Sequence, residues 1–122
     1  MDHYEEFTYS TQFTGPATIP VVTFRMVRVG KQVTMQSVDE EYAVPTTSNL
    51  KQAFINTSLI PTRFRPVSAQ GILFPLSVAN NNVLHIGRVM ILPTGQIQIQ
   101  SRDGAFTNTI GWEPFSITWI VI

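Results

Sequence analysis

The chain of 122 residues is long enough to form one domain with a hydrophobic core, and its length requires no second domain. It contains no cysteine, so disulfide bonds and thiolate metal sites are excluded. Its formal net charge at pH 7 is zero and only 13% of its residues are charged, so solubility depends on the many Ser, Thr, Asn and Gln side chains. The eight Lys and Arg residues are scattered along the chain, which argues against nucleic acid as a partner.

The first ten residues, MDHYEEFTYS, are acidic and lack the apolar segment of a secretory signal peptide, so we expect no such signal. The carboxylates of Asp2, Glu5 and Glu6 predict that this region is exposed. We expect residues 1–20 to form an N-terminal arm with a first strand, and residues 21–122 to form the body of a single domain.

The next elements read as β-strands, because helical periodicity is nearly absent from the chain. Residues 20–29 (PVVTFRMVRV) and 31–38 (KQVTMQSV) alternate between apolar and polar. Gly30-Lys31 between them suits a two-residue hairpin turn in which glycine takes the first central position. In residues 64–79, Pro66 and Pro75 are expected at strand ends, edges or bulges, because proline cannot donate to a sheet.

Turn residues separate the strands that follow. Asn80-Asn81-Asn82 predicts a turn, residues 83–92 (VLHIGRVMIL) a long strand, and Pro93-Thr94-Gly95 a turn with a left-handed glycine. In QIQIQS, Ile97 and Ile99 are expected to face the core and the glutamines to face outward. Asp103-Gly104 predicts another tight turn. About eight to ten short strands are predicted, which is the pattern of an antiparallel β-sandwich or jelly roll.

The last eight residues, FSITWIVI, are apolar on both alternating faces. They are too few for a membrane span, which needs about 20 apolar residues, so they predict a strand and no membrane insertion. Residues 83–92 show the same two-sided character, with Leu84, Ile86 and Met90 opposite Val89 and Ile91. Since the outer faces of a sandwich normally meet water, we expect one outer face to pack against other copies of the chain.

The order of several segments resembles the C-terminal heads of trimeric viral and phage fibre proteins. The segments are FRMVRVGKQVTMQ, LIPTRFRP, HIGRVMILPTGQIQIQ and FTNTIGWEPFSITWIVI, and the resemblance extends from about Val21 to Ile122. It implies that residues 21–122 form a jelly-roll head, related in architecture to the C1q and tumour-necrosis-factor heads. It also implies a homotrimer on the surface of a virion, as part of a fibre or tail. The sequence departs from the fibre pattern in having neither collagen-like repeats nor coiled-coil heptads before the head.

Such heads attach a virion to a host surface component, often a glycan, and the resemblance implies the same role here. In the implied trimer, Phe115, Ile117 and Trp119 face the core. The residues expected near the subunit interface are His85, Met90, Ile120 and Ile122. The N-terminal arm is expected to contact other virion proteins.

Catalysis has little support in the sequence, and no cofactor is expected. His3 and His85 are far apart, and no serine lies in a Gly-x-Ser-x-Gly setting. His85 reads as a core or interface histidine, and three copies could converge on an ion only if a three-fold axis passed nearby. Asp39-Glu40-Glu41 lacks the alternate spacing of a calcium loop and predicts a solvated loop. No metal site is therefore expected within one chain.

Two groups of residues are candidates for ligand binding. Trp112 with Glu113 could stack on a sugar and read its hydroxyl groups, with Asn80, Asn81, Asn82 and Tyr42 as neighbours, or Trp112 could simply pack against the sandwich. Arg63 and Arg65 could contact a sialylated or sulfated ligand, or pair with carboxylates such as those at 39–41. A non-enzymatic trimeric attachment head is the favoured function, and a structural capsid or tail component with no external ligand is the alternative.

Overall fold

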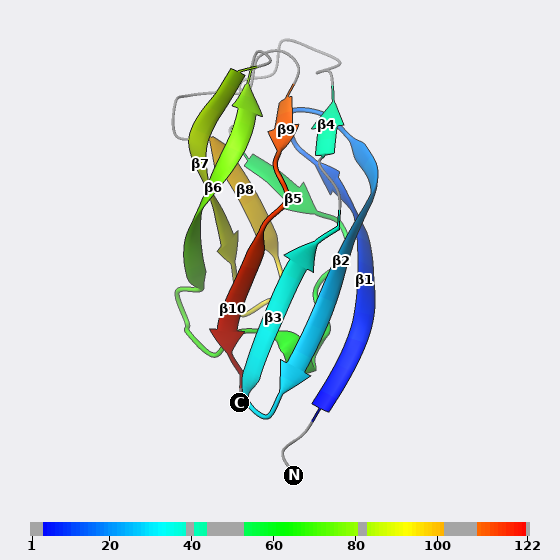
Figure 1. Cartoon of the computed structure of the whole chain (residues 1–122), viewed down its shortest axis with the longest axis vertical. Coiled ribbons are helices and arrows are strands. Elements are labelled where there is room, and N and C mark those ends of the chain that lie inside the picture. Colours follow the sequence, from blue (N-terminus) through cyan, green and yellow to red (C-terminus); the bar gives the residue numbers. More distant parts are fainter. Residues whose placement is uncertain (1–3, 39–40, 44–52, 81–82, 102–109, 122) are drawn as a thin grey trace.

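Ten antiparallel strands form one curled sheet in the computed structural model, which describes residues 4–38, 41–43, 53–80, 83–101 and 110–121 (Figure 1). The hydrogen-bonded order of the strands is β10-β3-β2-β1-β5-β8-β7-β6-β9-β4. The predicted antiparallel all-β fold is confirmed. None of the helical structure in the described ranges is long and apolar enough to cross a membrane.

The elements have the following bounds along the chain: β1 Tyr4–Thr14, β2 Ile19–Val29, β3 Gln32–Ser37, β4 Glu41–Ala43, β5 Ala53–Asn56, the 3-10 turn η1 Thr62–Phe64, β6 Ile72–Asn80, β7 Val83–Ile91, β8 Ile97–Ser101, β9 Ile110–Trp112 and β10 Ser116–Ile120.

The sheet curls into two layers around a single core. Strands β10, β3, β2 and β1 form one layer, and β5, β8, β7 and β6 form the other (Figure 1). The pairing of Phe13 with Asn56 and of Thr14 with Ile55 connects the layers at the β1–β5 junction. At the end of the molecule opposite the chain termini, β9 joins β6 to β4. We call that end the distal end, and the end that carries the first and last described residues the base.

Of the three turns expected from glycine, those at Gly30 and Gly95 are confirmed, and the one at Asp103-Gly104 lies outside the described residues. Val29 pairs with Gln32 across Gly30-Lys31, and Gly30 has a φ of 59°, as the first central residue of such a turn requires. Between β7 and β8, Gly95 has a φ of 91°, and its N–H donates to the Leu92 carbonyl over 2.9 Å. These turns fix the register of both hairpins.

Pro75 lies within β6, at a point where the strand has a neighbour on one side. It pairs with Arg88 of β7, whereas β9 contacts β6 only at Val78 and Ala79. The missing N–H of Pro75 therefore removes no bond from the ladder, which agrees with the expected edge position.

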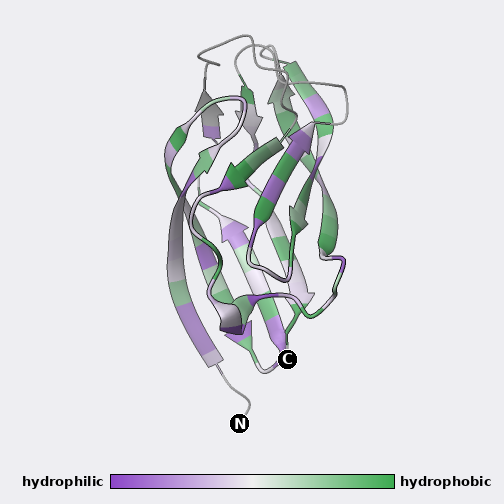
Figure 2. Ribbon diagram, turned by 180° about the vertical axis from the view of Figure 1, so that it is seen from behind, coloured by the Kyte–Doolittle hydropathy of each residue, from purple (hydrophilic) through white to green (hydrophobic). Residues whose placement is uncertain are grey.

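Aromatic and β-branched side chains from both layers fill the core. Hydrophobic and hydrophilic positions alternate along the strands when the molecule is seen from behind (Figure 2). The largest fully buried side chains are Trp112, Phe13, Phe24, Phe54, Phe64, Met26, Met35, Ile60, Ile91, Ile97 and Ile99. As expected, Ile97 and Ile99 face this core, and the glutamines between them are half-buried on the opposite face.

The apolar C-terminal run divides between core and surface. Ile117, Trp119 and Val121 are buried and Phe115 packs against the core, as expected. On the opposite face, Ile120 is 54% exposed. Strand β10 lies at one end of the hydrogen-bonded order, beside β3, and not at the centre of a layer.

The described part of the first twenty residues is integral to the domain. Strand β1 pairs with β2 along its length and with β5 at its end. Tyr9 and Phe13 are buried in the core, while Glu6 is exposed on the outer face. The exposure expected for this region therefore applies to one face of the strand and not to the whole segment.

A buried polar network connects β1, β5 and the β7–β8 turn. The side-chain amide of Asn56 donates to the Tyr9 hydroxyl (2.8 Å) and to the Ser58 and Gly95 carbonyls (2.9 and 3.1 Å). Its oxygen accepts the N–H of Ile97 over 2.8 Å, and the Tyr9 hydroxyl donates to the Ser58 carbonyl. Each member is satisfied by another, so the network stabilises the packing of the two layers.

Replacing Asn56 with alanine tests this network. The Asn56→Ala variant leaves the buried N–H of Ile97 without its partner and removes one of the two hydrogen bonds to the Gly95 carbonyl, so we expect the free energy of unfolding to fall by about 1 to 3 kcal/mol. Urea denaturation measures the change. Thr57→Ala is the matched control, because the neighbouring Thr57 is exposed and its loss is expected to cost about 0.5 kcal/mol or less. Equal losses in the two variants would contradict a structural role for the network.

Candidate binding surfaces

The distal end brings together residues that are far apart in the sequence. Tyr42 of β4 pairs with Gly111 of β9, and Trp112 pairs with Val78 near the end of β6, where Asn80 also lies. Part of the expected ligand group is thus assembled at one end of the molecule. Asn81 and Asn82, and the side chains of Tyr42 and Asn80, lie outside the described residues.

Trp112 does not present its ring to the solvent. It is fully buried, and its ring packs edge-on against Phe13 and Phe54, with ring centroids 5.2 and 5.3 Å away. Of the two alternatives for Trp112, the structure shows packing against the sandwich, and stacking on a sugar is wrong because neither face of the ring is open to a ligand. Among the described residues, its indole N–H has no hydrogen-bond acceptor. Glu113, which follows it, is half-buried, and its backbone N–H donates to the Ser77 carbonyl.

The outer face of the β10-β3-β2-β1 layer is rich in hydroxyl and amide groups. The strand registers place Thr8, Arg25, Gln36 and Ser116 in one row, and Glu6, Val27, Thr34 and Thr118 in the next. Thr34 and Thr118 are hydrogen bonded across the strands over 3.1 Å. This face offers many short polar groups, which are typical partners for the hydroxyl groups of a sugar.

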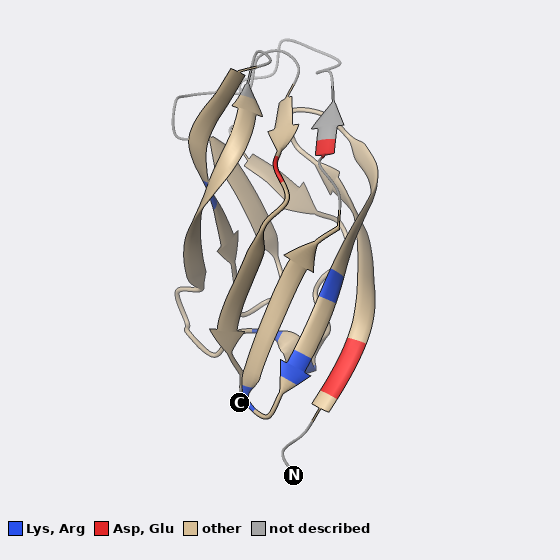
Figure 3. Cartoon of the chain, viewed as in Figure 1, with Lys and Arg blue, Asp and Glu red and all other residues tan. Residues whose placement is uncertain are grey.

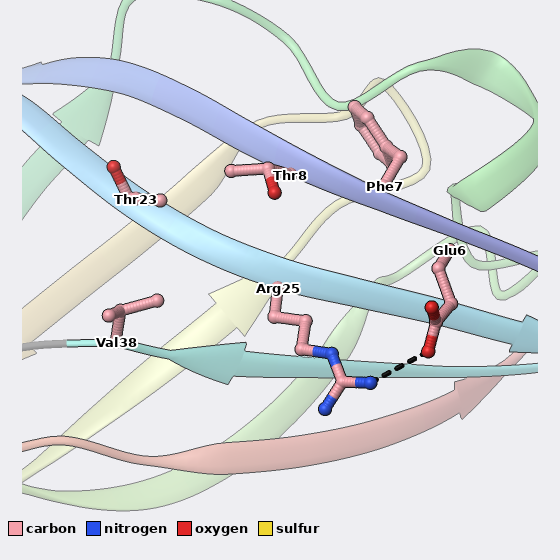
Figure 4. A pocket seen from close by; sticks show the side chains of 6 residues that line it. All are labelled: Glu6, Phe7, Thr8, Thr23, Arg25 and Val38. Atoms are coloured by element: carbon pink, nitrogen blue, oxygen red, sulfur yellow. Dashed lines mark hydrogen bonds and ion pairs between the residues drawn. The ribbon is translucent and has the colours of Figure 1, made fainter.

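A shallow pocket on this face is lined by Glu6, Phe7, Thr8, Thr23, Arg25 and Val38 (Figure 4). The Arg25 guanidinium donates to the Glu6 carboxylate over 2.7 Å, and Phe7 points to the opposite side of β1. Hydrogen bonds from Tyr4 and then from Arg25 lower the pKa of the exposed Glu6. Arg25 is thus the cation of this pocket, but it already has an internal carboxylate partner.

Arg63 forms the centre of a second cluster, at the base. Its guanidinium donates to both carboxylate oxygens of Glu5, at 2.6 to 3.0 Å. It also lies over the rings of Phe64 and Phe7, 4.9 and 5.6 Å from their centroids. The hydrogen bond to Glu5 raises the pKa of Arg63. The partner is Glu5 rather than the acidic residues at 39–41, of which the first two are outside the described residues. Glu41 begins β4 at the distal end and pairs with Trp112, so the solvated loop expected at 39–41 is wrong for this residue.

Arg65 and Arg28 lie beside Arg63, and together they line a hollow. Arg65 Nε donates to the Ile60 carbonyl over 2.7 Å, and Arg28 donates to the carbonyls of Gly30 and Arg63 over 2.8 and 2.6 Å. We call this feature the basal hollow, and it is lined by Arg28, Thr62, Arg63, Arg65, Pro66, Val67, Pro93 and Val121.

The expected ligand residues are thus divided between opposite ends of the molecule. Arg63 and Arg65 lie at the base, and the group around Trp112 lies at the distal end. The sequence reasoning missed Arg25 and Arg28, although the alternation within residues 20–29 places them on opposite faces of one strand. The hydrogen bond from Arg28 to the Arg63 carbonyl and the shared hollow show that Arg28 joins Arg63 and Arg65.

The residues expected at a subunit interface occupy different surfaces. Met90 lies on the outer face of β7 with the exposed Leu84 and Ile86, whereas Ile120 lies on the outer face of β10, in the other layer. His85 belongs to the inward-facing series of β7 and is half-buried. Ile122 lies outside the described residues.

Comparison with known proteins gives a match at the level of the fold. No family model and no curated protein matches the sequence. The reovirus attachment protein sigma1, solved in complex with alpha-2,3-sialyllactose, has a TM-score of 0.59 and 15% identity, over 98% of this chain and 66% of that chain. The C-terminal receptor-binding domain of the avian reovirus fibre sigmaC has a TM-score of 0.58 and 15% identity, over 99% of this chain and 77% of that chain.

This chain has the fold of reovirus fibre heads. A second avian reovirus sigmaC structure agrees, with a TM-score of 0.51 and 16% identity over 98% of this chain and 62% of that chain. The resemblance to viral fibre heads is confirmed for the fold. The kinship to the C1q and tumour-necrosis-factor heads stays a prediction.

The burial of Trp112 leads to a prediction about stability. The Trp112→Ala variant creates a cavity at the distal end of the core, so we expect the free energy of unfolding to fall by about 3 to 5 kcal/mol. The Trp112→Phe variant retains most of the apolar volume and removes an indole N–H without a described acceptor, so we expect a loss of about 1 to 2 kcal/mol. Chemical denaturation of both variants checks the difference, and a wild-type stability of Trp112→Ala would contradict the packing role.

Proposed function

We propose that this chain is the non-enzymatic head of a viral attachment fibre and that it binds a component of the host cell surface. The observation that carries the proposal is the match of 98% to 99% of the chain to two reovirus structures. One of those is an attachment protein in complex with a sialylated glycan, and the other is a receptor-binding domain. The polar outer face and the basal hollow offer groups suited to a glycan, which we infer to be the ligand.

Binding of the labelled chain to cultured host cells tests this role. We expect saturable binding that excess unlabelled chain displaces. We also expect the amount of bound chain to fall when the cells are treated beforehand with sialidase or a sulfatase. Flow cytometry measures the bound label, and an unrelated β-sandwich protein of similar size is the control. Absence of saturable binding to every cell type tested would overturn the attachment role and favour a structural capsid or tail component.

We also propose that the head assembles as a homotrimer through the outer face of β6 and β7. Leu73 of β6 is 54% exposed there, and Leu84 and Ile86 of β7 are 58% and 69% exposed. Their side chains lie on the same face as the half-buried Met90, so they form a largely apolar surface on adjacent strands. Arg88 lies between Ile86 and Met90 on this face, and its guanidinium donates to the side chain of Gln100 on β8. Burial of this surface against other copies would remove apolar area from water.

Light scattering after size exclusion tests the assembly. We expect a species near three times 13.7 kDa, and we expect Ile86→Asp to shift it towards the monomer because a carboxylate would be buried in an apolar interface. Val21→Asp is the matched control, because Val21 is 67% exposed on the other layer and the substitution is expected to leave the mass unchanged. A wild-type monomer at every concentration would contradict the trimer.

A further inference from the structure

We infer that the basal hollow is an oxyanion-binding site, which takes the carboxylate or sulfate group of a host glycan. The inference rests on the proposed attachment function and gives it a location and a ligand chemistry. The hollow gathers guanidinium groups from β2 and from the segment at η1, and it combines them with a hydroxyl group and apolar walls.

Positively charged side chains cluster at the base, although the net charge of the whole chain is zero. Four of the eight Lys and Arg residues of the chain lie there, namely Arg28, Lys31, Arg63 and Arg65. Lys31 is placed there by its carbonyl, which accepts the N–H of Val121 over 2.7 Å. Figure 3 shows these cations at the end where the chain terminates, with the acidic band of Glu5 and Glu6 beside them on β1. Such clustering raises the local concentration of anions.

Arg65 is the cation best placed to bind a ligand. Its described hydrogen bond runs from Nε to the Ile60 carbonyl, which is a neutral acceptor. This bond uses one of the five N–H donors of the guanidinium. The bond also holds the group in a fixed orientation beside Gly95, so little conformational entropy is lost when a ligand binds. A fixed guanidinium matches the two oxygens of a carboxylate or sulfate through paired hydrogen bonds.

Arg63 has a different role in the hollow. Its bidentate bond to Glu5 and its position over Phe64 and Phe7 attach η1 to β1. Glu5 offsets part of the positive charge, and the N–H of Arg65 donates to the Thr62 carbonyl at the end of the turn. The ion pair is therefore a positioning device, and Arg65 is the group that we expect to touch the ligand.

The remaining walls suit a sugar better than a free inorganic ion. Val67 and the half-buried Pro93 supply apolar surface against which a pyranose ring or an N-acetyl methyl group can pack, and Thr62 supplies an exposed hydroxyl group. The other two apolar lining residues, Pro66 and Val121, are buried behind them. The pocket in Figure 4 is the rival site, but its single arginine is already paired with Glu6.

Titration calorimetry of the full chain with 3′-sialyllactose and with lactose 3′-sulfate tests the inference, and lactose is the neutral probe. We expect both anionic probes to bind more tightly than lactose, and the binding to weaken as salt is added. We expect Arg65→Gln to weaken binding about 10-fold or more, because a charged hydrogen-bond donor is lost. Arg25→Gln, on the outer face of β2, removes a guanidinium outside the hollow and is expected to leave the affinity unchanged.

A second pair of variants tests the same site without removing Arg65 and its hydrogen bond to the Ile60 carbonyl. Val67 is 48% exposed at the rim of the hollow, so substitutions there leave the core intact. We expect Val67→Asp to abolish binding of both anionic probes by repulsion, while the isosteric Val67→Asn retains it. Equal affinities of these two variants would overturn the basal site, and loss of binding in Arg25→Gln alone would assign the ligand to the pocket in Figure 4.

The cell-binding assay separates failure of this site from failure of the attachment role. Saturable cell binding that is unaffected by Arg65→Gln and by Val67→Asp would overturn the oxyanion site and leave the attachment function in place. Binding of lactose as tight as that of the anionic probes would also overturn it, because the hollow would then recognise the sugar and not its charge.

Discussion

The long strands of this protein each give one face to a single core, and the two-residue alternation of side chains then assigns every other position to the outside. Because the sheet curls into two layers, the inward faces of β3 and β8 meet the same aromatic interior. The outer faces become two surfaces of different chemistry. One carries hydroxyl and amide groups on β10, β3, β2 and β1, and the other carries exposed leucine and isoleucine on β6 and β7.

Hydrogen bonds also connect the parts of the fold at two places, in the interior and at the base. In the interior, Asn56 connects β1 and β5 to the β7–β8 turn. At the base, the indole N–H of Trp119 donates to the Phe64 carbonyl over 2.7 Å, which attaches β10 to η1. The N–H of Val67 reaches the Ile120 carbonyl at 3.4 Å and covers part of the edge of β10. Arg63 and Arg65 thus lie on a segment that is held on two sides, which favours a preorganised site.

Local signals in the sequence predicted several strands and turns of this fold, but not the short strands β4 and β5. Gly30 and Gly95 mark their turns because positive φ suits glycine, and the isoleucines of β8 face inward because strand side chains alternate. Non-local pairings were not predictable in this way. The place of β1 beside β5, and the contact of Glu5 with Arg63 across 58 positions, depend on how the sheet curls. Trp112 shows the same limit, because alternation over a three-residue strand does not reveal that both of its faces are covered.

The two tryptophans of the chain lie at opposite ends of the core. Trp112 packs against Phe13 and Phe54 at the distal end. Trp119 is buried at the base, where its indole N–H donates to the carbonyl of Phe64 beside the arginine cluster. The protein therefore carries a separate intrinsic fluorophore for each end. A change confined to the base alters the environment of one indole and leaves the other as an internal reference, so the emission of the unlabelled chain distinguishes events at its two ends.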